Sequence, residues 1–350
     1  MPRNRPPMTA PVTDDPRDVA DRIARRFIRS DQIWGNYTLD LALEALLALD
    51  RATGSETYLA HVQHVFSERN QPPGTIVRFE TQPFCHVTYA LYRATGDKRY
   101  VAPFLAESRR YYETVPRSPE GAVLHRCTDG AERLLIDMLQ DYAARMARAG
   151  ALSDSDALRA ECVAQFRLYR DILRDPATGL YSQGRGWLED PDALSPGAWS
   201  RGHGWLIRGM VASLEVLPPG SPEFHELREY LVELCAALLA RQDAGGMWHQ
   251  LLHLPFEESF PETSGTALVC HALATALCEG FLEGDALPDA VLRAYRGVAS
   301  HVDAQGVVHG ACRGPGPLYS VDGYVRTPAA PDEPHGAPAV LFACAGVTRL

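Results

Sequence analysis

The sequence predicts an all-α fold built of helical hairpins that stack side by side. Apolar residues recur with a period near 3.6 through most of the chain, as they do over residues 39–54. One pattern (a helix, R-A-T-G, three polar residues, then Tyr and a new helix) occurs at 46–62 and again 42 residues later, at 88–104. A repeat of this length is typical of stacked units, here helix pairs.

The apolar pattern predicts twelve helices, or six hairpins. Six hairpins can close into a toroid, and the lack of a polar capping repeat at either end favours closure over an open array. In each R-A-T-G turn the glycine, Gly54 or Gly96, fits a left-handed helix C-cap. The predicted helices cover residues 18–29, 39–53, 57–68, 85–94, 101–114, 131–149, 155–173, 200–217, 222–241, 264–281, 287–301 and 336–348.

Three connecting segments are long and rich in Gly, Pro and Trp. Loops of this length in a compact fold usually carry function. We therefore expect the site to be formed by residues 174–199, 243–263 and 305–335.

Composition limits the classes of partner. The chain has 350 residues, of which 46% are hydrophobic, enough to bury a large core. Its formal net charge of −10 argues against a non-specific nucleic-acid or anionic-membrane binder. A single arginine pocket would still suffice for an anionic substrate. No stretch of about 18 apolar residues predicts a membrane span.

The beginning of the chain and its cysteines bear on location. Residues 1–15 are Pro-rich, and we expect a flexible tail there, followed by one domain over 16–350. No apolar run follows the first basic residues, so no secretory signal is expected. The eight cysteines are scattered without a C-x-x-C pair, which is typical of reduced, buried thiols. We expect a cytoplasmic monomer or homodimer that needs no cofactor.

The common catalytic motifs are absent from the sequence. It has no G-x-S-x-G, H-E-x-x-H, P-loop or G-x-G-x-x-G. His249 and His253 have the i, i+4 spacing of a metal-binding pair, but they follow Trp248 in a loop-like stretch with no third ligand nearby. The sequence therefore does not favour a metal site.

Asp137 is the most notable acid of the predicted helix over 131–149. It lies inside the run L-L-I-D-M-L, at the border of the apolar face, where a carboxylate is costly unless it is paired or functional. One interpretation is a surface pair with Arg133. The other is a catalytic acid whose pKa is raised by partial burial and by Asp141. Spacing alone does not choose between them.

The segment W-S-R-G-H-G-W, which begins at Trp199, lies at the start of another predicted helix. Gly202 and Gly204 weaken a helix, so something there must need bare backbone. A helix N-terminus and Arg201 both suit a carboxylate. Trp199 and Trp205 offer flat apolar faces. Together these features predict a site for a uronic acid, and the alternative is a glycine-kinked helix start packed by tryptophan.

Aromatic and polar residues recur at the starts of other predicted inner helices. A toroid with one open mouth would gather these starts around a single site. An N-cap pattern, E-T-S-G-T-A at 262–267, marks one of them. The residues are Trp34, Tyr37, Glu80, Trp248, His249 and Gln250.

These stretches resemble the unsaturated glycuronyl hydrolases, most closely glycoside hydrolase family 105, with family 88 as the relative. The family's W-A-R-G-x-G-W corresponds to residues 199–205, its Q-D-x-x-G-x-W-x-Q to 242–250, and its E-T-S-x-[ST]-A to 262–267. Its T-G-L after D-P, its C-x-G-x-G and its D-x-H-G resemble residues 175–180, 312–316 and 332–336. The similarity runs in the family's order from about residue 30 to the end.

The resemblance implies an (α/α)6 barrel and a particular reaction. Polysaccharide lyases leave a C4=C5 double bond in a terminal uronate, and these hydrolases hydrate it. An Asp protonates C4, water adds at C5, and the resulting hemiketal opens and releases the neighbouring sugar. Asp137 matches the I-D-x-L core of the family's W-[VIL]-D-x-L-[YF]-M motif, and the family's second acid aligns best with Glu80.

Substrate contacts are implied in the same way. Arg201 and the helix start would hold the uronate carboxylate. The chain departs from the family at the Asp motif, where Leu135 replaces Trp and Gln140-Asp141 replaces the aromatic-Met pair. His125 is kept from the family's F-W-H, and Gln183 stands where the family has a His after T-G-L. The residues expected to contact the substrate include Trp199, His203 and Trp205.

Three functions remain open from the sequence. The first is a hydrolase of small unsaturated uronyl oligosaccharides. The second is a sugar 2-epimerase on the same fold, for which His203 and His249 are a candidate pair near the toroid axis. The third is a non-catalytic sugar-binding relative.

Overall fold

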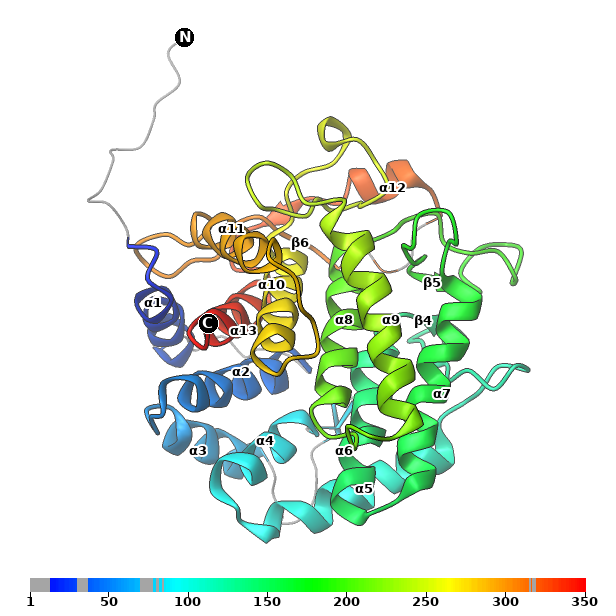
Figure 1. Cartoon of the computed structure of the whole chain (residues 1–350), viewed down its shortest axis with the longest axis horizontal. Helices are drawn as coiled ribbons and strands as arrows, with labels where there is room; N and C mark the ends of the chain where they lie inside the picture. Colours follow the sequence, from blue (N-terminus) through cyan, green and yellow to red (C-terminus); the bar gives the residue numbers. More distant parts are fainter. Residues whose placement is uncertain are drawn as a thin grey trace.

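The computed structural model describes residues 13–29, 37–69, 78–79, 82–83, 85–314, 316 and 319–350. Within these ranges the chain forms helices α1 to α13 and short strands (Figure 1). Trp34 and Glu80, two of the predicted site residues, lie outside the described residues, as does most of the predicted tail. None of the described helices has the length and apolar character needed to cross a membrane.

Six helices form an inner ring. All residues of α8 and α13 are buried, which is expected of helices enclosed on every side. In Figure 1, α13 lies between α2 and α10, and α8 contacts α10 on its other side. The ring consists of α2 (Tyr37–Thr53), α4 (His86–Thr95), α6 (Ala144–Ser153), α8 (Ser200–Leu214), α10 (Thr263–Cys278) and α13 (Gly336–Val347).

Six further helices pack outside this ring, and each precedes an inner helix in the chain. Outer helices such as α7, α9 and α11 bury one face and expose the other, as amphipathic surface helices do. The closed ring of six hairpins confirms the predicted toroid, an (α/α)6 barrel. The outer helices are α1 (Pro16–Arg29), α3 (Leu59–Arg69), α5 (Val101–Thr114), α7 (Asp156–Leu173), α9 (Pro222–Leu239) and α11 (Leu287–Ala299).

Because an outer helix returns the chain each time, the six inner helices run in the same direction. Their N-terminal ends therefore meet at one end of the barrel. There Asp40 on α2 accepts a hydrogen bond from the Val87 backbone N–H of α4, at 2.8 Å. The loop after α9 and the short α12 (Val321–Val325) lie at one end of α8 in Figure 1.

The predicted helix over 131–149 is wrong in its first half. Residues Glu132–Leu135 form strand β4, which pairs antiparallel with β3 (His125–Arg126) and β5 (Gly184–Arg185). A π-helical turn, Leu139–Ala143, then leads into α6. A short apolar run fits a buried strand as well as a buried helix, so periodicity could not separate the two.

The remaining strands are two-residue pairs. They are β1 (Arg78–Phe79) with β2 (Gln82–Pro83), and β6 (Ala311–Cys312) with β7 (Ala329–Ala330). The glycine C-caps are confirmed: Gly54 has φ 65° and Gly96 has φ 68°. The Gly96 N–H donates to the carbonyl of Tyr92 at 2.8 Å, which ends α4.

A row of buried charged side chains crosses the interior of the barrel. Glu44 accepts hydrogen bonds from Arg208 at 2.6 Å and from Arg148 at 3.1 Å. Arg148 also donates to Nδ1 of His86 at 3.0 Å, and His86 Nε2 lies 3.6 Å from a carboxylate oxygen of Asp141. These contacts join four of the inner-ring segments by charge as well as by packing.

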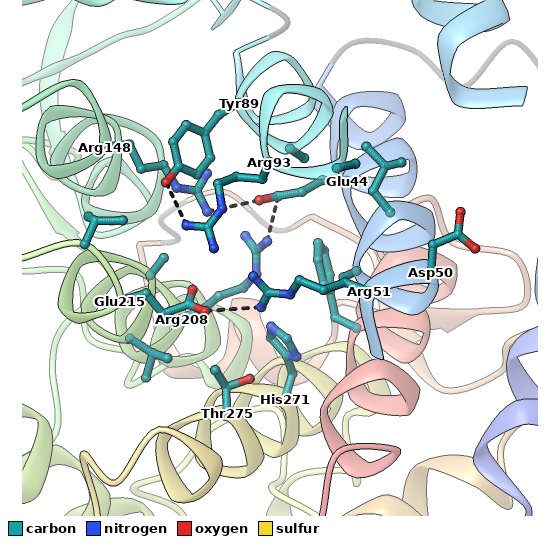
Figure 2. Close-up of a pocket in the computed structure, with 18 of the residues that line it drawn as sticks. Glu44, Asp50, Arg51, Tyr89, Arg93, Arg148, Arg208, Glu215, His271 and Thr275 are labelled. Atoms are coloured by element: carbon teal, nitrogen blue, oxygen red, sulfur yellow. Dashed lines mark hydrogen bonds and ion pairs between the residues drawn. The ribbon is translucent and has the colours of Figure 1, made fainter. Parts of the chain in front are cut away.

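The far end of the barrel, away from the helix N-termini, contains a cavity of about 370 Å³. Its lining comes from the C-terminal halves of the inner helices and includes Arg93, Arg208 and Phe342 (Figure 2).

Candidate functional site

Asp137 lies in the turn between β4 and the π-helical segment, and not within a helix. The Ile136 N–H donates to the carbonyl of Gln183 at 2.9 Å, and the Gln140 N–H donates to the carbonyl of Asp137 at 3.1 Å. The Asp137 side chain is half-buried, and its Oδ1 has no hydrogen-bond partner among the described residues. Burial raises the pKa of Asp137 to about 6, and the nearby Arg201 guanidinium opposes this shift.

The proposed partners of Asp137 both face other groups. Arg133 forms an ion pair with Asp129 at 2.8 Å, so the surface-pair interpretation is wrong. Asp141 accepts from Arg145 at 2.5 Å and from the Tyr111 hydroxyl at 3.1 Å. Burial would raise the pKa of Asp141, but Arg145 and His86 hold it well below its usual value. The raised pKa of Asp137 therefore comes from burial alone.

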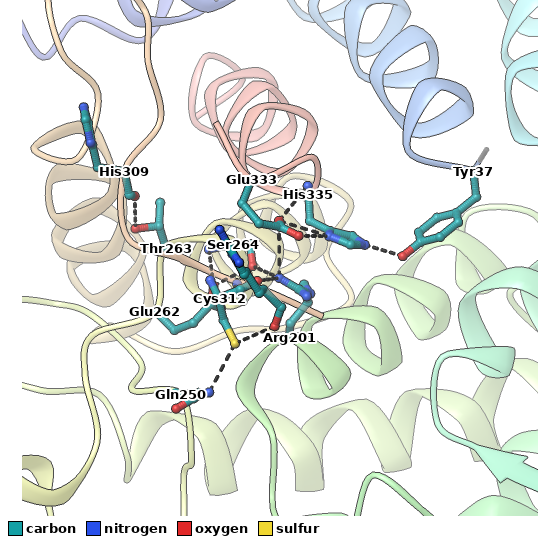
Figure 3. Close-up of polar contacts among 12 residues, drawn as sticks. Tyr37, Arg201, Gln250, Glu262, Thr263, Ser264, His309, Cys312, Glu333 and His335 are labelled. Carbon is teal, nitrogen blue, oxygen red and sulfur yellow. Dashed lines mark hydrogen bonds and ion pairs between the residues drawn. The ribbon is translucent and has the colours of Figure 1, made fainter. Parts of the chain in front are cut away.

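Arg201 is 0% exposed at the start of α8. Its Nη1 donates to Ser264 Oγ at 3.0 Å and to the Cys312 carbonyl at 2.6 Å (Figure 3). Its guanidinium carbon lies 4.6 Å from the ring centre of Trp199. Nε and Nη2 have no partner within the described part of the chain. A fixed guanidinium with free N–H groups is suited to bind a carboxylate.

Beside Arg201, Figure 3 shows a hydrogen-bonded series from Glu333 through His335 to Tyr37. Glu333 lies 3.7 Å from Arg201 Nη1 and 2.8 Å from His335 Nδ1. Burial and the Arg201 charge lower the pKa of His335, which favours the neutral ring. A neutral ring that donates from Nδ1 to Glu333 leaves Nε2 to accept from the Tyr37 hydroxyl. Burial raises the pKa of Tyr37, so this hydroxyl keeps its proton.

The sequence pattern predicts Tyr37 as a site residue but does not predict Glu333 or His335. Both belong to the D-E-P-H-G segment, so the signal was present. Gln140 was also missed: its side-chain amide is buried near Asp137, and neither amide atom has a partner among the described residues. Its position at a departure from the family motif was the available signal.

Glu262 explains the E-T-S-G-T-A segment structurally. It caps α10 by accepting from the backbone N–H groups of Ser264 and Gly265, and it also accepts from the Cys312 N–H at 2.9 Å. Gly265 leaves no room for a side chain, because a Cβ there would lie 2.8 Å from the Arg201 backbone nitrogen. The starts of α8 and α10 therefore pack closely, and this holds Arg201 in place.

The two glycines of W-S-R-G-H-G-W serve packing. A Cβ at Gly202 would lie 2.9 Å from Ile136 Cγ2, and one at Gly204 would lie 2.8 Å from Leu268 Cβ. The expectation that bare backbone is needed there for an anion is therefore replaced by close helix contact. The Ser200 N–H is also in use, since it donates to the carbonyl of Gln250.

His203 is a structural residue. Its Nε2 accepts from the Tyr181 backbone N–H at 2.9 Å, and its Nδ1 contacts the Trp199 carbonyl at 2.8 Å. Burial lowers its pKa to about 4. With both ring nitrogens bonded to backbone, His203 is not available to a substrate. Trp205 is buried and turns its ring edgewise to His335, with 6.4 Å between ring centres.

Trp248, His249 and Gln250 also have structural roles that differ from the prediction. Trp248 is 0% exposed, and its Nε1 donates to the Leu238 carbonyl at 2.7 Å. His249 is held by the Ser259 carbonyl and the Asp243 carboxylate through its two ring nitrogens. Gln250 donates to the carbonyl of Tyr324 at 2.8 Å. These contacts fix the loop after α9 beside the start of α8.

The metal interpretation of the 249/253 histidine pair gains no support from the geometry. His253 Nδ1 accepts from the Ala198 backbone N–H at 3.3 Å. Within the described residues, no group of three or more His, Cys, Asp or Glu side chains is arranged to hold a metal ion.

The last two predicted contacts lie on the strands that flank Asp137. His125 is half-buried on β3; burial lowers its pKa, and the Asp141 charge opposes this shift. Gln183 is buried just before β5 and accepts from the Tyr324 hydroxyl at 2.7 Å, while its own carbonyl holds the turn of Asp137.

The comparison with known protein families covers almost the whole chain. Residues 14–350 match Glycosyl Hydrolase Family 88. The chain belongs to this family. Family 88 membership therefore extends from α1 through α13, and it assigns the chain to the glycosidases.

Two named proteins are similar in sequence to this family 88 chain. Unsaturated rhamnogalacturonyl hydrolase YesR of Bacillus subtilis (strain 168) is 24% identical over 315 residues, which cover 89% of this chain and 88% of that protein. An unsaturated 3S-rhamnoglycuronyl hydrolase of Alteromonas sp. (strain LOR) is 27% identical over 146 residues, 41% of this chain and 35% of that protein.

Solved structures share the fold. A possible member of the GH105 family from Salmonella enterica serovar Paratyphi A superposes with a TM-score of 0.84 at 21% identity, covering 99% of this chain and 96% of that one. An unsaturated glucuronyl hydrolase specific for heparin gives a TM-score of 0.71 at 12% identity, covering 94% and 95%.

Proposed function

We propose that this family 88 chain is an unsaturated glycuronyl hydrolase of the rhamnogalacturonyl type. Its substrates are small unsaturated oligosaccharides from polysaccharide lyases, and it hydrates the C4=C5 vinyl ether of their terminal uronate. One observation carries the proposal: a carboxyl group with a raised pKa, Asp137, lies near a buried guanidinium, Arg201, that has two free nitrogens.

In this reaction Asp137 donates its proton to C4 of the uronate. The electrons of the double bond move to C4, which leaves a positive charge on C5 shared with the ring oxygen. Water adds at C5, and the carboxylate of Asp137 takes up the proton that the water releases. The hemiketal opens by cleavage of its C5–O5 bond, which leaves a ketone at C5 and a hemiacetal at C1. The hemiacetal then collapses to an aldehyde, and its hydroxyl proton passes to the oxygen of the departing sugar. A pKa of about 6 supports the first step, because a general acid must carry a proton near neutral pH.

Arg201 binds the uronate carboxylate through Nε and Nη2. Its Nη1 contacts to Ser264 and Cys312 fix the guanidinium before the substrate arrives, which lowers the entropy lost on binding. The hydroxyl of Tyr37, oriented by His335, is available to contact the sugar. The ring of Trp199 packs against the guanidinium of Arg201, and the ring of Trp205 packs against His335.

The other two candidate functions have less support. An epimerase using His203 and His249 would need ring nitrogens open to the sugar, but those nitrogens are bonded to backbone atoms and to Asp243. A non-catalytic sugar binder would have no use for a carboxyl group kept partly protonated at neutral pH.

The deciding experiment is Asp137→Asn, assayed by the loss of the ultraviolet absorbance of unsaturated disaccharides. We expect a fall in kcat of about 10²–10⁴-fold with the fold retained. Asp289→Asn is the matched control, because Asp289 is an exposed acid of α11. Turnover by the wild-type protein without loss of the double bond, or activity of the Asp137→Asn variant, would contradict the proposed mechanism.

We also propose a cytoplasmic location and a monomeric or homodimeric state. All eight cysteines, each within the described residues, are free, which supports a reducing compartment. Light scattering of the purified chain measures the oligomeric state directly.

A further inference from the structure

The cavity at the far end of the barrel is lined by all six inner helices. Four arginines approach it, each from a different helix: Arg51 on α2, Arg93 on α4, Arg148 on α6 and Arg208 on α8. Figure 2 shows their guanidinium groups gathered around one space. α10 and α13 complete the lining.

Three of the four arginines form ion pairs with acids that line the cavity. Glu44 pairs with Arg148 and Arg208, and Glu215 pairs with Arg51 at 3.2 Å. Two further acids line the cavity, but Glu56 is exposed on its rim. Asp50 lies on the far side of α2 in Figure 2, where it accepts from Ser55 and from the Tyr58 backbone N–H. Because Arg51 and Arg93 are exposed as well, the buried groups inside the cavity are Arg148 and Arg208, which share the carboxylate of Glu44.

Helix electrostatics explain only part of this cluster. Arg51 and Arg93 lie in the last turns of α2 and α4, where a cation offsets the negative end of the helix dipole. Arg148 and Arg208 lie within their helices and are buried. Neither the helix dipole nor contact with solvent therefore offsets the desolvation of their charges. A buried cation in such a place needs further hydrogen-bond acceptors.

Those acceptors are missing among the described residues. Arg208 is 3% exposed, and its Nε and Nη1 have no hydrogen-bond partner there. Thr275 is also 3% exposed, and its Oγ1 is likewise unpartnered. Each buried donor left without an acceptor costs about 1–3 kcal/mol. Both side chains line the same cavity, so an anion bound there would offer acceptors to these groups.

The walls favour an organic ligand over a bare inorganic ion. Phe342 lies under Arg208, with 3.9 Å from the guanidinium carbon to the ring centre, and Leu47 and Val211 also line the cavity. A volume of about 370 Å³ falls in the range of small-molecule sites.

We propose that this cavity is a second ligand site, which binds a small organic anion. Its carboxylate or phosphate head lies among Arg93, Arg208 and Thr275, and its apolar body lies against Leu47 and Val211. The site is separate from that of Asp137, which lies at the opposite ends of the same inner helices, and it does not depend on the reaction proposed above.

The test is titration calorimetry of the full chain at pH 7 and fixed ionic strength. Benzoate is the probe for an organic anion, and inorganic phosphate is the probe for a bare oxyanion. We expect saturable one-site binding of benzoate, at least tenfold tighter than that of phosphate. Phosphate binding as tight as benzoate binding would overturn the organic assignment, and no saturable heat from either probe would leave the arginines only a structural role.

Variants locate the binding. Arg93→Gln changes an exposed residue, and Thr275→Val removes an unpartnered hydroxyl without changing the shape of the side chain, so both should fold. Each should weaken benzoate binding at least tenfold, while the exposed Arg109→Gln on α5 should not change it. Thr275→Val should also keep or raise the thermal midpoint without ligand, which separates lost binding from lost folding.

Arg201→Gln tests whether the probe occupies the other end of the barrel. Benzoate binding should be unchanged in this variant. Binding that is lost in Arg201→Gln, or kept in full by Arg93→Gln, would overturn the proposal.

Discussion

The pH dependence of turnover follows from the position of Asp137. Burial raises its pKa from 3.8 to about 6. The protonated fraction is then about 90% at pH 5, half at pH 6, about a tenth at pH 7 and about 1% at pH 8. An aspartate of ordinary pKa would be protonated to less than about 0.1% at pH 7. The tertiary structure therefore raises the supply of active acid at neutral pH by about a hundredfold.

The perturbation is pH itself, and the assay is kcat/KM for an unsaturated disaccharide between pH 4.5 and 8.5, followed by the loss of its ultraviolet absorbance. We expect a falling limb centred near pH 6 that approaches a tenfold loss per pH unit. A profile that is flat from pH 5 to 8, or whose fall is centred near pH 4, would refute the assignment of Asp137 as the acid.

A second buried acid provides a control. Burial also raises the pKa of Asp40, on α2, to about 6, while its carboxylate accepts from the backbone of α4. Asp40→Asn should leave the falling limb where it is, because Asp40 does not belong to the proposed catalytic group. Loss of the falling limb in Asp40→Asn would show that the limb reports Asp40 and that its assignment to Asp137 is wrong.

Three further outcomes concern stability. Glu44→Gln should lower the free energy of unfolding in urea by about 3–5 kcal/mol, because two buried arginines lose their carboxylate. Glu56→Gln, at an exposed residue, should change it by less than about 0.5 kcal/mol. Equally small effects of the two variants would contradict the structural role of the Glu44 ion pairs. Asp137→Asn should stabilise the fold by about 1–3 kcal/mol at pH 7: the folded pKa is raised, so ionisation destabilises the fold above about pH 4, and the gain should vanish below that pH. Gly204→Ala should cost about 1–3 kcal/mol by thermal unfolding, because its Cβ would lie 2.8 Å from that of Leu268; an unchanged midpoint would show that the two helices can separate freely.

Local signals predicted the barrel well. The R-A-T-G turns and the apolar period fix where helices begin and end, because caps and burial stripes depend on residues near in sequence. The failure over residues 131–137 has the same origin. Strand β4 exists because β3 and β5 pair with it, and one of these partners lies about 50 residues away along the chain.

The candidate site was predicted in part. Asp137 and Arg201 stood out because a carboxylate at an apolar border and an arginine beside two glycines are unusual locally, but spacing left the role of Asp137 open, and the family resemblance is what favoured a catalytic acid. Trp248 and His203 were misassigned because aromatic and imidazole groups serve packing as readily as binding, and only their hydrogen-bond partners tell which.

The sequence alone determined that the chain forms six helical hairpins, and that the W-S-R-G-H-G-W segment is a critical helix start. The tertiary structure decided what each residue of that segment does. The glycines let α8 approach Ile136 and Leu268, His203 binds backbone, and Arg201 is held by Ser264 and Cys312 with two nitrogens left free. These roles depend on contacts between residues up to 111 positions apart, which no local pattern encodes.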